Sequence, residues 1–150
     1  MHPGFMPRWT RPAIVLAAAL ALAACTSTTS PSASAGGGGT TVDVALSEFK
    51  VEFSTTDIPA GEVTFNVTND GAIEHEFVVF KTDLAEDALP EEGAEVTEDD
   101  PGLTSMGEVE EVGPDTSKSF TATLDAGSYV GICNVTGHYD SGMHIHFTVD

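Results

Sequence analysis

From residue 41 onward, apolar residues recur at every second position in short runs that end at turn residues. Residues 42–46, 63–67 and 143–149 all follow this pattern, and Pro59-Ala60-Gly61 is a typical turn between two runs. A period of two places the apolar side chains on one face of a β-strand. The pattern therefore predicts an all-β domain over residues 41–150, a Greek-key antiparallel β-sandwich.

The predicted strands number seven, and short turns rich in Gly, Pro and Asn separate them. They cover residues 42–46, 49–53, 63–67, 75–81, 120–124, 128–133 and 143–149. Aromatic side chains in these strands are expected to fill one modest core. The expected core residues are Phe49, Phe53, Phe65, Phe77, Phe120 and Phe147.

One long segment, residues 83–111, departs from the alternation and holds twelve acidic residues and no basic one. Asp83 and Glu86 have capping-box spacing, which predicts a short helix over 84–89. Residues 95–101 are expected to form a solvated loop. An excursion of this length between strands is either functional or simply solvated surface, and the pattern leaves both readings open.

The charge of the chain excludes several classes of partner. The sequence has 24 Asp and Glu against 5 Lys and Arg. Nucleic-acid binding requires basic residues that neutralise phosphates, and docking on anionic lipid requires them too. Neither is expected here. The two cysteines also exclude a scaffold built on several disulfides.

The N-terminal segment has the layout of an export signal. Arg8 and Arg11 precede residues 13–24, an unbroken apolar run that is too short to span a bilayer but suits a signal peptide. The run ends at Cys25 in a Leu-Ala-Ala-Cys sequence that resembles a bacterial lipobox. We therefore expect residues 1–24 to be a lipoprotein signal peptide and Cys25 to be lipidated. The alternative is ordinary secretion with Cys25 as a leftover thiol.

The residues after Cys25 predict a flexible tether. Residues 25–40 contain the lipidated Cys and a linker rich in Ser, Thr and Gly, without apolar periodicity. Such a linker averages roughly 20 Å end to end and reaches about 50 Å when stretched. The domain is thus expected to be anchored to the cell membrane by lipid alone, facing the periplasm or the cell exterior.

A group of possible metal ligands lies near the C-terminus. Cys133, His138 and Met143 are spaced Cys-x4-His-x4-Met on a loop between two predicted strands. A thiolate, an imidazole and a thioether are together suited to copper. A trigonal site with two His and one Cys needs a second imidazole, and His75 at the start of a strand is the candidate.

These residues resemble the cupredoxins, the small blue-copper proteins. The matching pieces are residues 69–75, residues 126–133 and the loop CNVTGHYDSGM at 133–143. Within that family the loop spacing is most similar to rusticyanin and sulfocyanin. The resemblance covers residues 41–150 and implies one type 1 copper ion. Its implied ligands are His75, Cys133, His138 and Met143.

The sequence departs from the family pattern at two positions. Thr136 stands where many cupredoxins have Pro before the Gly-His pair, which favours a looser loop. Glu76 stands where many have Asn after the first ligand His. That Asn supports the thiolate loop, so the hydrogen bonding around the sulfur is open at this point.

Other roles for the same residues have to be weighed. Cys133 paired with His138 as a base would also suit a catalytic thiol, although the Met favours metal. Met143 taken alone fits the core face of the last strand. His144 and His146 alternate with Met143, so we expect both to point outward as exposed strand residues rather than as ligands of a second metal.

The ligand set implies electron transfer rather than catalysis, because four protein ligands leave copper no position for substrate. We expect a monomer that is not an enzyme, with His138 beside Gly137 and Gly142 as the electron port. The alternatives are a copper carrier or buffer of the cell envelope and a sandwich without metal.

From Cys25 onward the sequence has three lysines and 24 acidic residues, a net charge of −21 with His neutral. We therefore expect a redox partner with a basic face, such as a c-type cytochrome or an oxidase domain. Its contact surface is expected near His138, with Glu108, Glu110 and Glu111 on the rim.

Overall fold

The computed structural model describes residues 39–150; the predicted signal peptide, Cys25 and most of the predicted linker lie outside this range. The described part is built from β-strands and turns, and no segment of it is a helix long and apolar enough to cross a membrane. Its strands are β1 Thr40–Ser47, β2 Lys50–Phe53, β3 Gly61–Asn69, β4 His75–Lys81, β5 Glu91–Glu92, β6 Glu95–Val96, β7 Thr104–Val112, β8 Ser117–Leu124, β9 Gly127–Ile132 and β10 His144–Val149.

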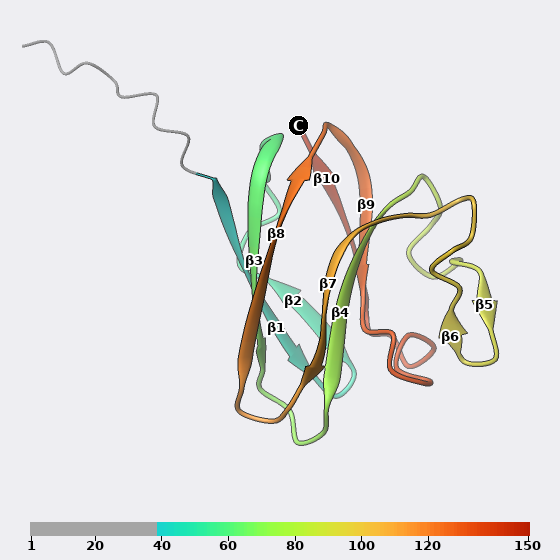
Figure 1. Ribbon diagram of the computed structural model, residues 1–150. Coiled ribbons are helices and arrows are strands. Elements are labelled where there is room, and N and C mark those ends of the chain that lie inside the picture. Colours follow the sequence, from blue (N-terminus) through green and yellow to red (C-terminus); the bar gives the residue numbers. More distant parts are fainter. Residues whose placement is uncertain (1–38) are drawn as a thin grey trace, which may run out of the picture. The chain divides into compact units, whose positions relative to one another are not determined.

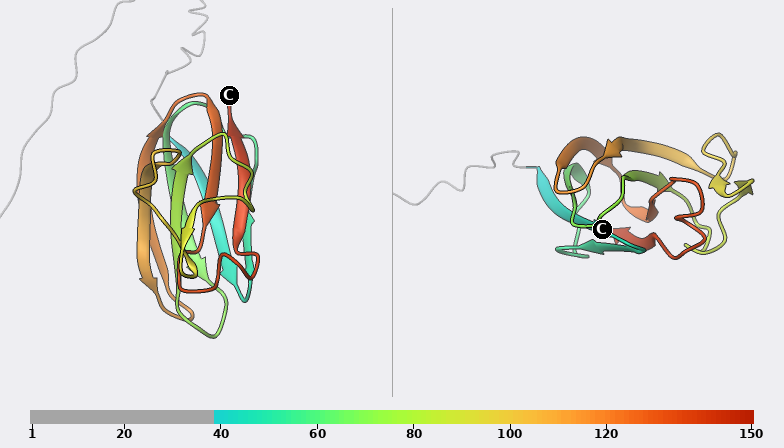
Figure 2. Two further views of the ribbon diagram at one scale, coloured as in Figure 1. Left: turned by 90° about the vertical axis from the view of Figure 1, so that its right-hand side faces the viewer. Right: turned by 90° about the horizontal axis from the view of Figure 1, so that it is seen from below.

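Two four-stranded sheets face each other, with the strand orders β2-β1-β3-β8 and β10-β9-β4-β7 (Figure 1). The predicted β-sandwich is therefore confirmed. All pairings within the two sheets are antiparallel except that of β1 with β3, which is parallel. The two-stranded β5-β6 hairpin lies outside the sandwich, over the outer face of the second sheet (Figure 2).

The core between the sheets comes from the inward positions of the alternating runs. Phe65, Phe77 and Phe147 are buried there, and Phe53 and Phe120 pack against them. Ring centroids of neighbouring phenylalanines lie 5.2–6.3 Å apart, as in edge and offset aromatic pairs. This aromatic cluster fixes how the two sheets lie against each other.

Phe49 was expected in this core, and that expectation is wrong. Its side chain is 44% exposed. The residue lies in the turn between β1 and β2, so it has left the strand alternation, and its ring stands edge-on against the ring of His138 at 5.3 Å.

The sequence pattern also missed a strand. β7 lies within the acidic segment and pairs with β4, completing the second sheet. Its pairing is interrupted by two register shifts, one beside His75 and one beside Val79. A bulge breaks the period of two, so buried Val109 and Val112 are three residues apart and show no alternation.

The predicted helix over 84–89 is absent. A single hydrogen bond from the N–H of Ala88 to the carbonyl of Ala85 marks one turn. Six residues supply too few internal hydrogen bonds for an isolated helix. The two leucines of this segment also differ in burial, because Leu84 is 39% exposed and Leu89 is buried. The sequence also allowed a long acidic loop in place of a helix here, and the structure contains the loop.

The acidic excursion, residues 82–103, is anchored rather than freely solvated. Three of its apolar residues join a second buried cluster on the outer face of β4 and β9; that cluster consists of Val78, Phe80, Leu89, Val96, Leu103, Val130, Ile132 and Tyr139. The expected solvated loop over 95–101 is accordingly only partly correct, because Val96 is 4% exposed. The excursion covers the sheet that carries the site.

Candidate metal centre

Strand ends bring the predicted ligands to one pole of the sandwich. β4 begins at His75, β9 ends one residue before Cys133, and β10 begins one residue after Met143. In Figure 1 this pole is the lower end, and the 69–75 and 133–143 loops both lie in the lower half of the domain. His75 stands opposite Val112, the last residue of β7.

Three of the four predicted ligands meet in one buried cluster. The Sγ of Cys133 lies 3.3 Å from Nδ1 of His138 and 3.7 Å from Nδ1 of His75. The two Nδ1 atoms are 3.2 Å apart. His75 and Cys133 are fully buried, and His138 is 7% exposed. Two imidazole nitrogens and a thiol thus converge on one point, as ligands of a single small ion would.

Met143 closes the loop beside this cluster. Its carbonyl accepts the N–H of Cys133 at 2.9 Å, and its own N–H donates to the carbonyl of His138 at 3.1 Å. The side chain is completely buried in the same core cluster as Cys133. Met143 can therefore be a core residue and also lie beside the ligand cluster.

Burial sets the protonation of the three donors. Desolvation lowers the pKa of His75, the neighbouring His138 lowers it further, and Glu48 opposes the shift. Desolvation likewise lowers the pKa of His138. Both imidazoles are therefore neutral near pH 7, the form that binds metal. Burial raises the pKa of the Cys133 thiol, so a metal ion must displace its proton.

Main-chain N–H groups surround the sulfur of Cys133. The N–H of Glu76 donates to Sγ of Cys133 at 3.3 Å, and the N–H of Val135 also favours the thiolate. Such hydrogen bonds stabilise the charged sulfur. The Glu76 carboxylate is not part of this contact; burial first, and then the charges of other carboxylates, raise its pKa to about 7. The departure at Glu76 therefore leaves main-chain hydrogen bonding to the sulfur in place.

The acidic excursion holds the ligand loop from outside. Asn134 accepts the N–H of Val96 at 2.7 Å and donates to the Val96 carbonyl at 3.2 Å. The hydroxyl of Tyr139 accepts the N–H of Leu89 at 2.9 Å and donates to the carbonyl of Glu86 at 2.8 Å. The N–H of Gly137 donates to the carbonyl of Ala94 at 2.8 Å. Sequence analysis missed this role, whose only signal was the isolated apolar residues among the acids.

Asn69 holds the opposite side of the site. Its side-chain amide donates to the carbonyls of Ile73 and Val112, both at 2.7 Å, and its oxygen accepts the N–H of Gly71 at 2.8 Å. Asn69 is completely buried. It therefore ties the turn before His75 to the end of β7.

His144 and His146 lie away from the cluster. His146 is exposed, as expected, and its ring bonds Ser128. His144 is half-buried, which corrects the expectation of an exposed residue, because the excursion residue Glu86 and the Tyr139 ring lie over it. Neither belongs to a group of three metal-binding side chains within residues 39–150.

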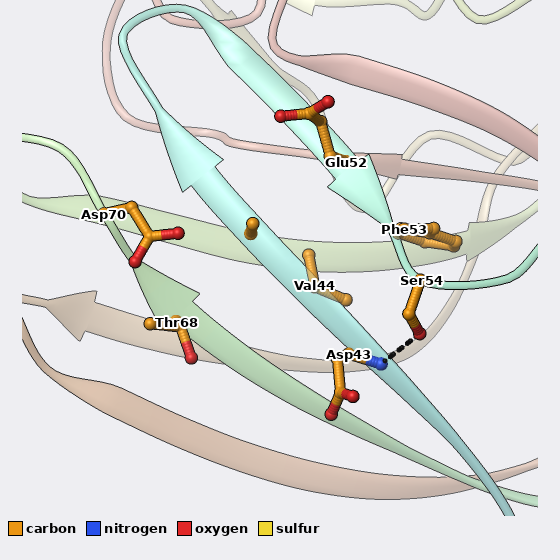
Figure 3. A pocket seen from close by; sticks show the side chains of 8 residues that line it. Asp43, Val44, Glu52, Phe53, Ser54, Thr68 and Asp70 are labelled. Carbon is orange, nitrogen blue, oxygen red and sulfur yellow. Dashed lines mark hydrogen bonds between the residues drawn. The ribbon is translucent and has the colours of Figure 1, made fainter.

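Two other features do not have the chemistry of this centre. Glu76, Glu98 and Glu108 bring carboxylates together on the outer face of the second sheet. A shallow hollow on the first sheet is lined by Asp43, Val44, Ala45, Glu52, Phe53, Ser54, Thr68 and Asp70 (Figure 3). Carboxylates suit hard ions, and neither group contains His, Cys or Met.

Comparison with known proteins identifies the architecture. No family model and no curated protein matches the sequence. An auracyanin from Roseiflexus castenholzii is 25% identical with a TM-score of 0.58, covering 75% of this chain and 98% of its own. Auracyanin A from Chloroflexus aurantiacus, described as a "blue" copper protein, is 24% identical with a TM-score of 0.53, covering 75% and 100%. Rusticyanin from Thiobacillus ferrooxidans is 23% identical with a TM-score of 0.51, covering 75% and 79%. These likenesses confirm the resemblance drawn from the sequence.

Proposed function

We propose that this chain, which has the cupredoxin fold, is a blue-copper electron-transfer protein. The observation that carries the proposal is the convergence of His75, Cys133 and His138, whose donor atoms lie within 4.8 Å of one another. Together with the thioether of Met143, they would supply the donor set of a type 1 site for one copper ion. Copper bound there would supply one-electron exchange between Cu(II) and Cu(I).

The protein's part is to hold the donors in a fixed, dry arrangement. His75 is held by the strand ladder, and the three loop ligands are held by a loop that is hydrogen-bonded on both sides. A rigid site limits the rearrangement between the two oxidation states. Four protein donors leave no position for a substrate, so the site functions as an electron carrier and not as an enzyme. Complete burial of His75, Cys133 and Met143 also disfavours the copper carrier or buffer, which needs accessible exchange.

The electron exit lies at His138. It is the one ring of the cluster that reaches the surface, and two exposed apolar side chains flank the same pole: Phe49 is 44% and Ile73 is 43% exposed. The Phe49 ring lies against the His138 ring. A partner that covers this apolar surface would come within van der Waals distance of a ligand.

The charge around the pole favours a basic partner. β7 carries exposed Glu108, Glu110 and Glu111 and ends beside His75. A complementary basic face on a c-type cytochrome or an oxidase domain would be steered toward this side of the protein. In this proposal the protein meets its redox partner as a monomer.

Anchoring completes the proposal. Cleavage after residue 24 and lipidation of Cys25 would place the domain outside the cytoplasm on a tether through residue 40. β1 begins at the pole opposite the metal centre and runs toward it (Figure 1). The tether would therefore join the domain at the pole opposite His138.

Copper reconstitution followed by a visible spectrum tests the function. The purified domain is expected to become intensely blue with one equivalent of Cu(II) and to bleach reversibly on reduction, because the colour arises from thiolate-to-copper charge transfer. C133S is expected to lose the absorption and remain folded, and H146A, which changes an exposed histidine, is expected to keep it. A colourless reconstituted protein, or a C133S variant that stays blue, would reject the proposal.

A further inference from the structure

Glu48 occupies a position that the copper proposal does not use. It follows β1, and its Oε1 accepts the N–H of Ala72 at 2.7 Å and that of Ile73 at 3.0 Å. A Cβ added at Gly71 would lie 2.6 Å from the same Oε1. The 69–75 loop thus closes around this carboxylate, and a side chain at position 71 would displace it.

The same oxygen faces a copper ligand. Oε1 of Glu48 lies 3.8 Å from Nε2 of His75. This Nε2 is buried and has no hydrogen-bond partner, whereas Nδ1 of the same ring points to Cys133 and His138. The His75 side chain is 0% exposed and that of Glu48 is 34% exposed. Glu48 therefore lies between the buried ring and solvent.

Metal binding by His75 would leave a proton on the Nε2 atom that faces Glu48. A histidine that binds metal through Nδ1 is neutral and carries its proton on Nε2. A buried N–H needs an acceptor, and metal-binding histidines commonly donate their second N–H to a carboxylate, which fixes the ring orientation. A separation of 3.8 Å exceeds a hydrogen bond, so a small shift of the carboxylate toward the ring is required.

We propose that Glu48 is the positioning residue for His75: its carboxylate accepts the Nε2–H, orients the imidazole and favours the more positive, oxidised centre. This inference rests on the proposed copper function. The rival role is purely structural, in which Glu48 serves only to hold the 69–75 loop.

Two matched variants separate these roles. E48Q keeps a side-chain oxygen for the N–H groups of Ala72 and Ile73 but removes the negative charge. E74Q removes the same charge from an exposed residue of the same loop, adjacent to His75 in sequence. The first readout is the affinity of each protein for Cu(II) and Cu(I), measured by competition with chelators.

E48Q is expected to weaken Cu(II) binding about tenfold and Cu(I) binding less. A tenfold change in the ratio of the two affinities would raise the potential of a one-electron couple by about 59 mV, so the rise expected in E48Q is positive and smaller than this. E74Q is expected to stay within about twofold of the unmodified protein, since exposed charges are screened. Equal effects of E48Q and E74Q would overturn the inference. So would an equal loss of both affinities in E48Q together with a lower unfolding temperature, which indicates the structural role.

The metal-free protein provides the second readout. Nitrogen-15 NMR of the His75 ring is expected to show the Nε2–H tautomer in the unmodified protein and a shifted Nε2 resonance in E48Q. An Nδ1–H tautomer, or no change in E48Q, would reject the contact. Because this measurement needs no copper, failure of the blue-copper function and failure of the Glu48 contact are distinguishable.

Discussion

The two sides of the candidate metal pole hold the proposed ligands by different means. His75 belongs to β4, so the strand ladder and the buried amide of Asn69 fix its backbone. The proposed ligands Cys133, His138 and Met143 belong to a loop, and that loop depends on long-range contacts with the acidic excursion, residues 82–103.

The strand side is therefore expected to affect the stability of the domain, and the loop side the properties of the metal site. The strand side is continuous with the sandwich core, so damage there affects the whole domain. The loop side is fastened to the excursion mostly by part-buried hydrogen bonds, so damage there is expected to affect the metal site more than the fold. His138, the most exposed ligand, belongs to the loop side.

Removing Asn69 tests the strand side and is expected to have the largest effect. N69A leaves the buried Val112 carbonyl and the part-buried Ile73 carbonyl without their donor, which should lower the free energy of unfolding by about 3 kcal/mol. Denaturant unfolding of the metal-free protein measures this loss. N66A is the control, because Asn66 is exposed and its side-chain amide donates to the Asp43 carboxylate on a neighbouring exposed position. Equal losses in the two variants would show that Asn69 has no special role.

Removing Asn134 tests the loop side. N134A breaks the hydrogen bonds to both backbone groups of Val96 and should cost about 1–2 kcal/mol. Copper should dissociate faster from N134A than from N69A for a given loss of stability, because the loop carries three ligands. Transfer of copper to a chelator, followed by the blue absorption, gives the rate. S141A, in the same loop, is the control for a hydrogen bond made within the loop.

M143L removes the thioether from the loop side of the site and changes the core volume little. Such a swap usually costs less than about 1.5 kcal/mol, and the protein should keep its copper. Loss of the thioether and a more apolar surrounding disfavour Cu(II), so the reduction potential should rise. Protein-film voltammetry measures the shift. Complete loss of copper would mean that Met143 is a main ligand.

The smallest expected effect concerns the partner. A steered electron-transfer rate with a basic partner should fall as salt rises, because at ~0.15 M the Debye length is about 8 Å. Stopped-flow kinetics with the native partner measures it. E110Q, on β7 near the metal pole, should slow the low-salt rate more than E62Q, which lies at the start of β3 near the opposite pole. A rate that does not change with salt would leave the acidic residues a role in solubility alone.

Several features could be read from the sequence because they are local. The period of two and the turn residues sufficed for seven strands and the β-sandwich, since alternation is set by the geometry of the strand itself. The spacing of Cys133, His138 and Met143 on one loop predicted their approach. His75, 58 residues before Cys133, required the cupredoxin resemblance as well.

The features that could not be read depend on contacts between distant segments. β7 is hidden by its bulges, and Phe49 follows the alternation of its neighbours although the turn exposes it. The predicted helix at 84–89 relied on a local capping signal, but burial of Leu89 on the outer sheet face outweighed it.

The sequence by itself determined the class of fold, the acidic charge and the kind of ligands. Only the tertiary structure decided what surrounds those ligands: the excursion that holds the loop, the main-chain N–H of Glu76 at the sulfur, and Glu48 beside His75. The physical reason is that strand periodicity arises from each residue's own backbone. The contacts around a metal site instead join residues 27 to 57 positions apart, and the folded chain alone brings these together.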